Sequence, residues 1–187
     1  MANINAPMGF QPYRHRGGGI MRPSKYLINS TYATSLYTGD AVILSSGFLA
    51  IGAQDSAVIA GVFAGCEFLD ASGVPGARFS PYWPGGTVTT GSADAIAWVY
   101  DDPMISYLAQ CYSVTAFVAA THRGFKCDLI ANTAGSTLTG QSGMEVNLGD
   151  TGTGQLLVLD AVDQIGNAVG VNTKVECMFI KSLLAGT

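Results

Sequence analysis

The chain has 187 residues, enough for one domain to bury a hydrophobic core without disulfides or a structural metal. Only 12% of the residues are charged and 48% are hydrophobic, a composition that excludes a largely disordered chain. The formal net charge of −4 disfavours a nucleic-acid partner, and no apolar run is long and uninterrupted enough to predict a membrane-spanning helix.

The first 39 residues differ in charge from the rest. They hold four cations and none of the 13 acidic residues, which leaves a formal charge of −8 on the remainder. Three prolines and a glycine triplet lie within residues 1–25, and these residue types disfavour both helices and strand ladders. We therefore expect residues 1–25 to form an extended basic arm, mobile in the free protein, before a β-rich body at 26–187. The candidate docking residues of the arm are Arg14, His15, Arg16, Arg22 and Lys25.

An arm of four cations on an acidic body favours an acidic protein surface as its partner. The N-terminus lacks the apolar segment of a secretory signal, so we expect synthesis in a cytoplasm.

The body alternates short apolar segments with turns. Residues 41–44 and 48–51 flank a Ser-Ser-Gly turn and predict a β-hairpin. Residues 93–100 alternate small apolar side chains on one face with Asp94, Ile96, Trp98 and Tyr100 on the other, and predict a strand packed on both faces. Further strands are expected at 58–63, 65–69, 105–110, 113–118, 125–130, 155–159 and 174–182. Apart from a weak pattern at 109–120, no apolar stripe predicts a helix, so we expect an all-β fold: a single β-sandwich, jelly roll or small barrel.

The four cysteines and two histidines do not predict a metal, cofactor or enzymatic site. Cys66, Cys111, Cys127 and Cys177 are far apart in sequence, without the spacing of a zinc site. Without an export signal, disulfides are disfavoured, so we expect four buried free thiols. A Ser-His-Asp hydrolase using His122 is the least favoured alternative, because no GxSxG segment presents a nucleophilic serine. We expect no enzymatic activity.

Three other features admit a functional and a structural interpretation. The glycine-rich segment 149–154 lacks the Gly-Lys-Ser/Thr ending of a phosphate-binding loop, which favours an ordinary loop. Asp101 and Asp102 are neighbours, and neighbours in a strand point to opposite faces, which favours a solvated turn before Pro103 over a paired site. Tyr82 and Trp83 are candidate interface aromatics, although core packing is an alternative use of such residues.

Several segments resemble a known family. Residues 9–19 (GFQPYRHRGGG), 39–42, 61–65, 82–87 and 167–170 resemble the capsid cement, or head decoration, proteins of tailed bacteriophages. The resemblance implies a β-rich homotrimer on the outer capsid surface of the virion. Such a protein binds the major capsid protein and stabilises contacts between its subunits.

Two alternatives to a cement protein remain open from the sequence. One is a tail or head-completion component, which the resemblance does not separate from a cement protein. The other is a glycan-binding β-sandwich module that uses Tyr82 and Trp83 as its platform.

Overall fold

The structure is a computed structural model that describes residues 3–69, 77–85, 93–150, 152 and 154–185. These residues form strands and one short helix, so the predicted all-β fold is confirmed. The elements are β1 Gln11–His15, β2 Ser24–Ile28, β3 Leu36–Tyr37, β4 Ala41–Ser45, β5 Phe48–Ile51, β6 Gly61–Leu69, β7 Ala77–Ser80, β8 Tyr82–Trp83, β9 Ala95–Tyr100, β10 Ile105–Gln110, α1 Ala119–His122, β11 Lys126–Ile130, β12 Glu145–Asn147, β13 Leu156–Ala161 and β14 Lys174–Phe179.

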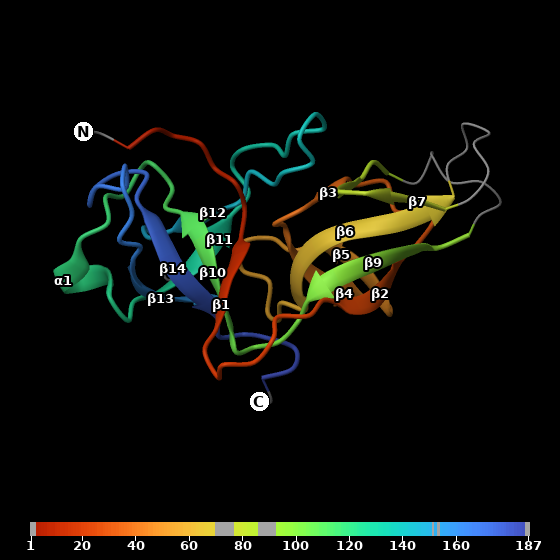
Figure 1. Ribbon diagram of the computed structural model, residues 1–187, viewed down its shortest axis with the longest axis horizontal. Helices are drawn as coiled ribbons and strands as arrows, with labels where there is room; N and C mark the ends of the chain where they lie inside the picture. Colours follow the sequence, from red (N-terminus) through yellow and green to blue (C-terminus); the bar gives the residue numbers. More distant parts are fainter. Residues whose placement is uncertain (1–2, 70–76, 86–92, 151, 153, 186–187) are drawn as a thin grey trace.

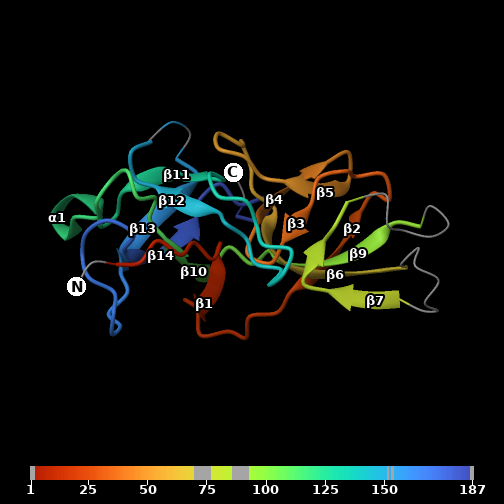
Figure 2. The same cartoon turned by 90° about the horizontal axis from the view of Figure 1, so that it is seen from above.

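The strands divide into two lobes that lie side by side (Figures 1 and 2). One sheet has the order β1-β10-β14-β13-β11-β12 and forms what we call the C-terminal lobe. The other has the order β2-β9-β6-β4-β5, with β7 also paired to β6, and forms the inserted lobe, because its strands lie between β1 and β10 in the chain. The ladders between named strands are all antiparallel. The described residues thus form two large sheets, and β3 and β8 form a third, two-stranded sheet.

Each sheet curls towards closure, so the lobes are barrel-like. In the C-terminal lobe, Tyr112 N–H donates to the Val146 carbonyl at 2.8 Å, which returns β12 to the end of β10. In the inserted lobe, the two edge strands β2 and β5 lie close to each other. The buried side chains form two groups, one inside the inserted lobe and one that fills the C-terminal lobe and extends to Ala41, Ile59 and Val62 of the inserted lobe. Closure of this kind protects strand edges that an open sheet would expose.

Local sequence signals account for several elements. The predicted hairpin is present as β4 and β5, joined by Ser46 and Gly47, both at positive φ (51° and 85°), as a two-residue hairpin turn requires. The strands expected at 58–63 and 65–69 are one strand, β6, with an irregular register between Phe63 and Gly65. The strand expected at 113–118 is absent, and this segment is instead a loop leading to α1.

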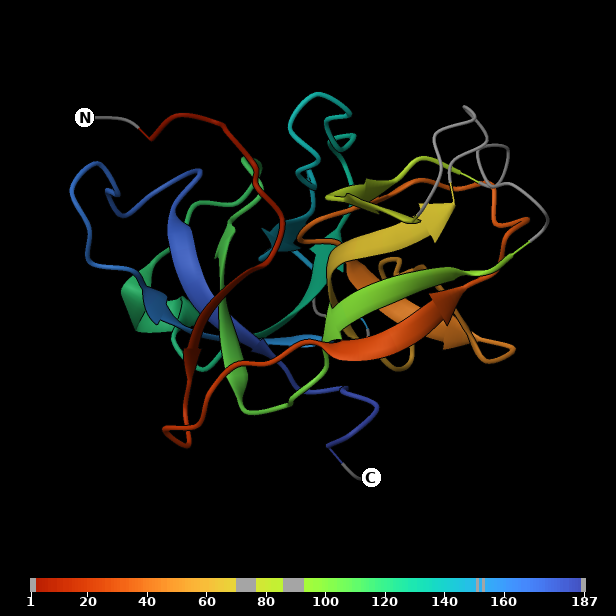
Figure 3. The same ribbon diagram turned by 45° about the vertical axis from the view of Figure 1, so that its right-hand side comes forward.

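The prediction that residues 1–25 cannot fill a strand ladder is wrong. β1 pairs with β10, and the predicted boundary at residue 25 falls inside β2. Pro12 is tolerated because β1 is an edge strand and its register shifts between Pro12 and Arg14. Phe10 is fully buried, with its ring 5.0 Å from that of Phe179. Figure 3 shows the red N-terminal segment lying along the green and blue strands of the C-terminal lobe.

The segment before β1 is also attached to the C-terminal lobe. The side-chain amide of Asn3 donates to the carbonyls of Ala168 and Val171, and its oxygen accepts the Ala168 N–H. Gln110 bonds the backbone of Ile4 and Ala6. These contacts contradict the expectation of an arm that stands apart from the body.

Hydrogen bonds join the two lobes in addition to the chain segments that run between them. Ile59 of the inserted lobe exchanges backbone hydrogen bonds with the segment after β14, donating to Lys181 and accepting from Leu183. The buried Gln155 donates from its side chain to the carbonyls of Ala53 and Ser56. The C-terminal segment therefore fastens one lobe to the other.

The four cysteines are free and buried, as predicted. Burial raises the pKa of the Cys66 and Cys127 thiols to about 12 and that of the Cys177 thiol well above its ordinary value. The thiols act as small apolar side chains in the cores.

Candidate functional site

The connection between β1 and β2 is an exposed loop, residues 16–23, which we call the basic loop. At its base, Gly17 and Gly19 donate their N–H groups to His15 Nδ1 at 3.1 and 2.8 Å. Because Nδ1 accepts, the neutral ring carries its proton on Nε2 and donates it to Asp102 Oδ2 at 3.0 Å. Gly18 has a φ of 77° and a Cβ on Gly19 would lie 2.9 Å from the His15 ring, so the glycine triplet permits this tight wrapping. His15 is thus a loop anchor.

Arg14, a predicted docking residue, forms an ion pair within the chain, and its side chain remains 60% exposed. Its guanidinium donates to both carboxylate oxygens of Glu176 on β14, each at 2.6 Å. The Glu176 side chain is only 8% exposed, so the pair neutralises a nearly buried charge. The hydrogen bonds to Glu176 raise the pKa of Arg14 above its usual value.

The other predicted cations remain at the surface. Arg16, Arg22 and Lys25 are exposed, and in the described part of the chain none of them pairs with a carboxylate. The guanidinium of Arg16 contacts the Met178 sulfur at 3.4 Å, a weak acceptor. Ile20 is 74% exposed in the same loop. The basic loop therefore presents two arginines and an aliphatic side chain to solvent.

Asp101 and Asp102 lie in the connection between β9 and β10 and bond residues at the two ends of the basic loop. Asp101 accepts hydrogen bonds from the hydroxyls of Ser24 and Tyr26 on β2, at 2.8 and 3.0 Å. Burial and the bond to Asp101 raise the pKa of Tyr26 to about 12. Asp102 bonds His15 before the loop, so the two carboxylates serve different elements, as expected for neighbours. The expected turn at Pro103 is present, since Ile105 N–H donates to the Asp102 carbonyl, but both aspartate side chains are half-buried and hydrogen-bonded.

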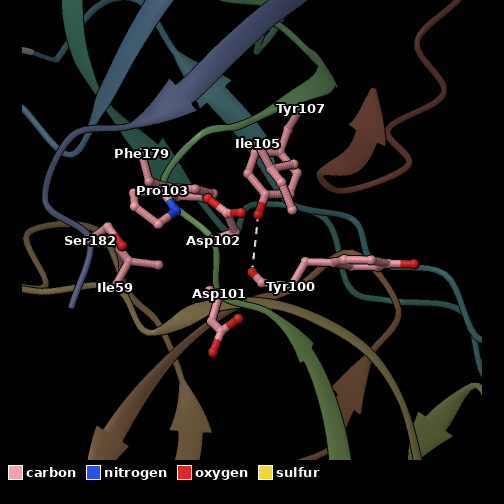
Figure 4. Close-up of a pocket in the computed structure, with 10 residues that line it drawn as sticks. Ile59, Tyr100, Asp101, Asp102, Pro103, Ile105, Tyr107, Phe179 and Ser182 are labelled. Carbon is pink, nitrogen blue, oxygen red and sulfur yellow. Dashed lines mark hydrogen bonds between the residues drawn. The ribbon is translucent and has the colours of Figure 1, made fainter. Parts of the chain in front are cut away.

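Both aspartates line a small cavity where the lobes meet (Figure 4). Its volume is about 10 Å³, room for about one water molecule. Across it, the Tyr107 hydroxyl donates to the Tyr100 carbonyl at 3.0 Å. The cavity is too small for an organic substrate and belongs to the packing between the lobes.

Trp83 is wrong as an interface aromatic, because it is fully buried in the inserted lobe. Its ring packs edge-on against Phe68 at 5.4 Å, and its indole N–H donates to the Tyr32 carbonyl at 3.0 Å. A large ring with a satisfied N–H is suited to a core position. Tyr82 is half-buried and stacks on Tyr37 at 5.7 Å, so the two predicted aromatics do not form a shared platform.

A second exposed surface, which the sequence did not predict, lies on the inserted lobe across β2, β9, β6 and β7. In β9 the small residues at 95, 97 and 99 are buried, whereas Ile96 and Trp98 remain half-exposed. The predicted alternation is therefore present, but its aromatic side faces outwards. Opposite side chains of β2, β6 and β7 share this surface, which we call the outer face: Lys25, Leu27, Glu67, Phe79, Ile96 and Trp98.

The alternative catalytic and metal sites gain no support from the described residues. His122 accepts the Val118 N–H on Nδ1 and lies between the rings of Phe117 and Phe125. No group of three or more His, Cys, Asp or Glu side chains that could hold a metal ion occurs in the described ranges. Of the glycine-rich segment 149–154, residues 151 and 153 lie outside the described residues.

None of the helical structure in the described ranges has the length and apolar character to cross a bilayer. A scan against protein-family models, a search of curated proteins and a search of solved structures each found no match for this chain.

Proposed function

We propose that the chain is a structural virion protein that binds the outer surface of a bacteriophage capsid and stabilises contacts between major capsid protein subunits. The observation that supports this best is the basic loop. It gathers Arg16, Arg22 and the exposed Ile20 on a chain whose net charge is negative. Residues 9–19, one of the segments that resemble capsid cement proteins, include β1 and the first half of this loop.

The binding mechanism is attachment by a loop that is held in shape before it meets the shell. Because His15 fixes Gly17 and Gly19, the loop loses little conformational entropy on docking. Each exposed ion pair contributes only about 0.2–1 kcal/mol. Many copies on one shell add these contributions, because a protein that binds only the assembled state stabilises that state.

A homotrimer would present three basic loops to the same shell. Once one loop is bound, the others attach at a high effective concentration, so weak single contacts suffice.

A binding assay with empty shells of the major capsid protein tests the proposal. In the variant Arg16→Gln/Arg22→Gln we expect co-sedimentation with shells to weaken about 2- to 30-fold, from two lost ion pairs, and to depend less on salt. The matched control is Lys126→Gln/Lys174→Gln, which removes the same charge from the C-terminal lobe and should bind like the original chain. Equal binding by both variants at all salt concentrations would overturn the role of the basic loop.

Counting copies per particle separates the cement function from its nearest alternative. A copy number close to that of the major capsid protein supports a capsid-surface protein. A few copies per particle would instead indicate a tail or head-completion component.

A further inference from the structure

A pocket of about 430 Å³ lies between the N-terminal segment, residues 3–6, and the segment 166–174 that leads into β14. This volume is within the range of ligand-binding pockets. Two side-chain amides hold its walls. Asn3 makes three hydrogen bonds to the backbone of the second segment, and Asn167 makes three more to neighbouring backbone groups. The shape of this cavity, which we call the terminal pocket, is therefore fixed by bonds within the chain.

Asn172 lines the same pocket, but its side chain has no partner. It is 9% exposed, and in the described part of the chain neither its side-chain oxygen nor its side-chain nitrogen makes a hydrogen bond. A buried polar group without a partner costs free energy, which a bound ligand recovers. Because the terminal torsion of asparagine is broad, a turn of the carboxamide brings its oxygen to a donor in the pocket.

The terminal pocket also has one cation and an apolar wall. Lys174 lines it, and in the ranges that the structure describes its amine makes no ion pair or hydrogen bond. Ile4, in the wall formed by the N-terminal segment, is 83% exposed. An occupant that matches these groups brings an anion for Lys174, an apolar side chain for Ile4, and both a donor and an acceptor for Asn172.

We propose that the terminal pocket binds an extended acidic segment of another protein. The N–H and C=O of a peptide backbone match the oxygen and nitrogen of the free Asn172 carboxamide. An apolar side chain of the bound segment contacts Ile4, and an aspartate or glutamate of the segment reaches Lys174. Main-chain hydrogen bonds then provide affinity and side-chain contacts provide specificity, as is general for the recognition of extended peptides.

The terminal pocket and the basic loop lie at opposite ends of β1. Residues 3–6 precede this strand and the basic loop follows it. Figures 1 and 3 show the N-terminal segment at the top of the C-terminal lobe and the basic loop at its bottom. A chain docked through its basic loop therefore leaves the pocket open, and Lys174 takes no part in that docking. Peptide binding at the pocket does not depend on the capsid.

Fluorescence anisotropy of a labelled peptide with the purified full-length protein tests the pocket. The probe is a short blocked peptide of alternating valine and aspartate, compared with peptides that carry asparagine or lysine in place of aspartate. We expect the aspartate probe to bind most tightly, although the negative net charge of the chain favours the lysine probe in any nonspecific contact. N-methylation of the aspartate probe should abolish binding, because it removes the backbone donors.

Two variants separate the roles of the carboxamide and the cation. Asn172→Gly suits the left-handed φ of 55° at this position, so it should fold normally and bind every probe about 5-fold or more weakly, from two lost hydrogen bonds. Lys174→Gln should weaken the aspartate probe about 2- to 5-fold and leave the asparagine probe unchanged. Asn132→Gly and Lys126→Gln change exposed residues of the same types elsewhere and should bind like the original chain.

The proposal is overturned if no probe binds, if the lysine or the N-methylated probe binds as tightly as the aspartate probe, or if folded Asn172→Gly binds like the original chain. Self-association that Asn172→Gly abolishes would also overturn it, since a second copy would then fill the pocket. Because these assays contain no capsid, failure here leaves the role of the basic loop unaffected. Conversely, a failure of Arg16→Gln/Arg22→Gln to weaken shell binding leaves the terminal pocket unaffected.

Discussion

Arg14 on β1 and Glu176 on β14 form a two-point ion pair that spans 162 positions of sequence. In the sheet, β10 lies between β1 and β14, so the Arg14 side chain reaches over β10. It neutralises a carboxylate that is nearly buried. We expect Arg14→Ala to lower the melting temperature more than Arg22→Ala, because only the first change leaves a nearly buried charge unpaired. Thermal unfolding of both variants measures this difference. Arg14→Met/Glu176→Leu should recover stability relative to Arg14→Ala, whereas equal loss in the two single variants would show that the pair is dispensable.

Phe10 tests whether the N-terminal segment belongs to the fold. Its ring is fully buried and packs against Phe179, so Phe10→Ala should lower the free energy of unfolding by about 3–5 kcal/mol. Urea denaturation followed by circular dichroism gives this value. Tyr13→Ala, at a residue that is 45% exposed, is the control and should cost far less. If removing Phe10 cost no more than removing Tyr13, the segment would be an arm after all.

Glu145 should make the protein less stable as the pH rises. It is buried, with Oε1 lacking a hydrogen-bond partner among the described residues, and burial raises its pKa from 4.5 to about 7. The folded state therefore binds this proton more tightly than the unfolded state, so stability declines between about pH 4.5 and 7 and then levels off. Glu145→Gln should stabilise the protein at pH 8 by about 1–3 kcal/mol and have little effect at pH 4.5.

The comparison between Glu145→Gln and the original chain isolates this residue. Burial also raises the pKa of Asp40 to about 6, but Asp40 is present in both proteins and its effect cancels. Denaturant unfolding at several pH values is the measurement. A stability difference that does not change with pH would contradict a protonated Glu145 in the fold.

The buried thiols should be chemically silent in the folded protein. A thiol reagent should find almost no reactive cysteine before denaturation and four afterwards without reductant, since all four are free and buried. Cys177→Ser should destabilise by about 1–3 kcal/mol, the cost of a poorly satisfied buried hydroxyl. Two or fewer thiols after denaturation would reveal disulfides and refute this arrangement.

Local patterns in the sequence predict much of this fold but not its long-range pairing. The β4–β5 hairpin is encoded by adjacent residues, and the turn at Ser46 and Gly47 fixes its register. The partner of β1 is distant: the Arg14 carbonyl accepts from Ser106, 92 positions away. Proline and glycine content gave no sign of that partner, because an edge strand tolerates both residue types.

The candidate site was likewise predictable from local sequence only in part. Composition located the cations of the N-terminal region, and Arg16, Arg22 and Lys25 are indeed exposed. It could not show that Glu176 neutralises Arg14 or that Asp102 binds His15, since both acids are distant in sequence from their partners. For β9, the alternation revealed two faces, but only the surrounding sheet determines that Ala97 is buried and Trp98 faces outwards.

An electron cryo-microscopy reconstruction of shells incubated with this protein tests most directly whether the chain binds the capsid through its basic loop. We expect β-rich density at regularly repeated positions on the outer surface, with the basic loop facing the shell and Arg16 and Arg22 near acidic side chains of the major capsid protein. Shells without such density, or density in which the basic loop points away from the shell, would contradict it.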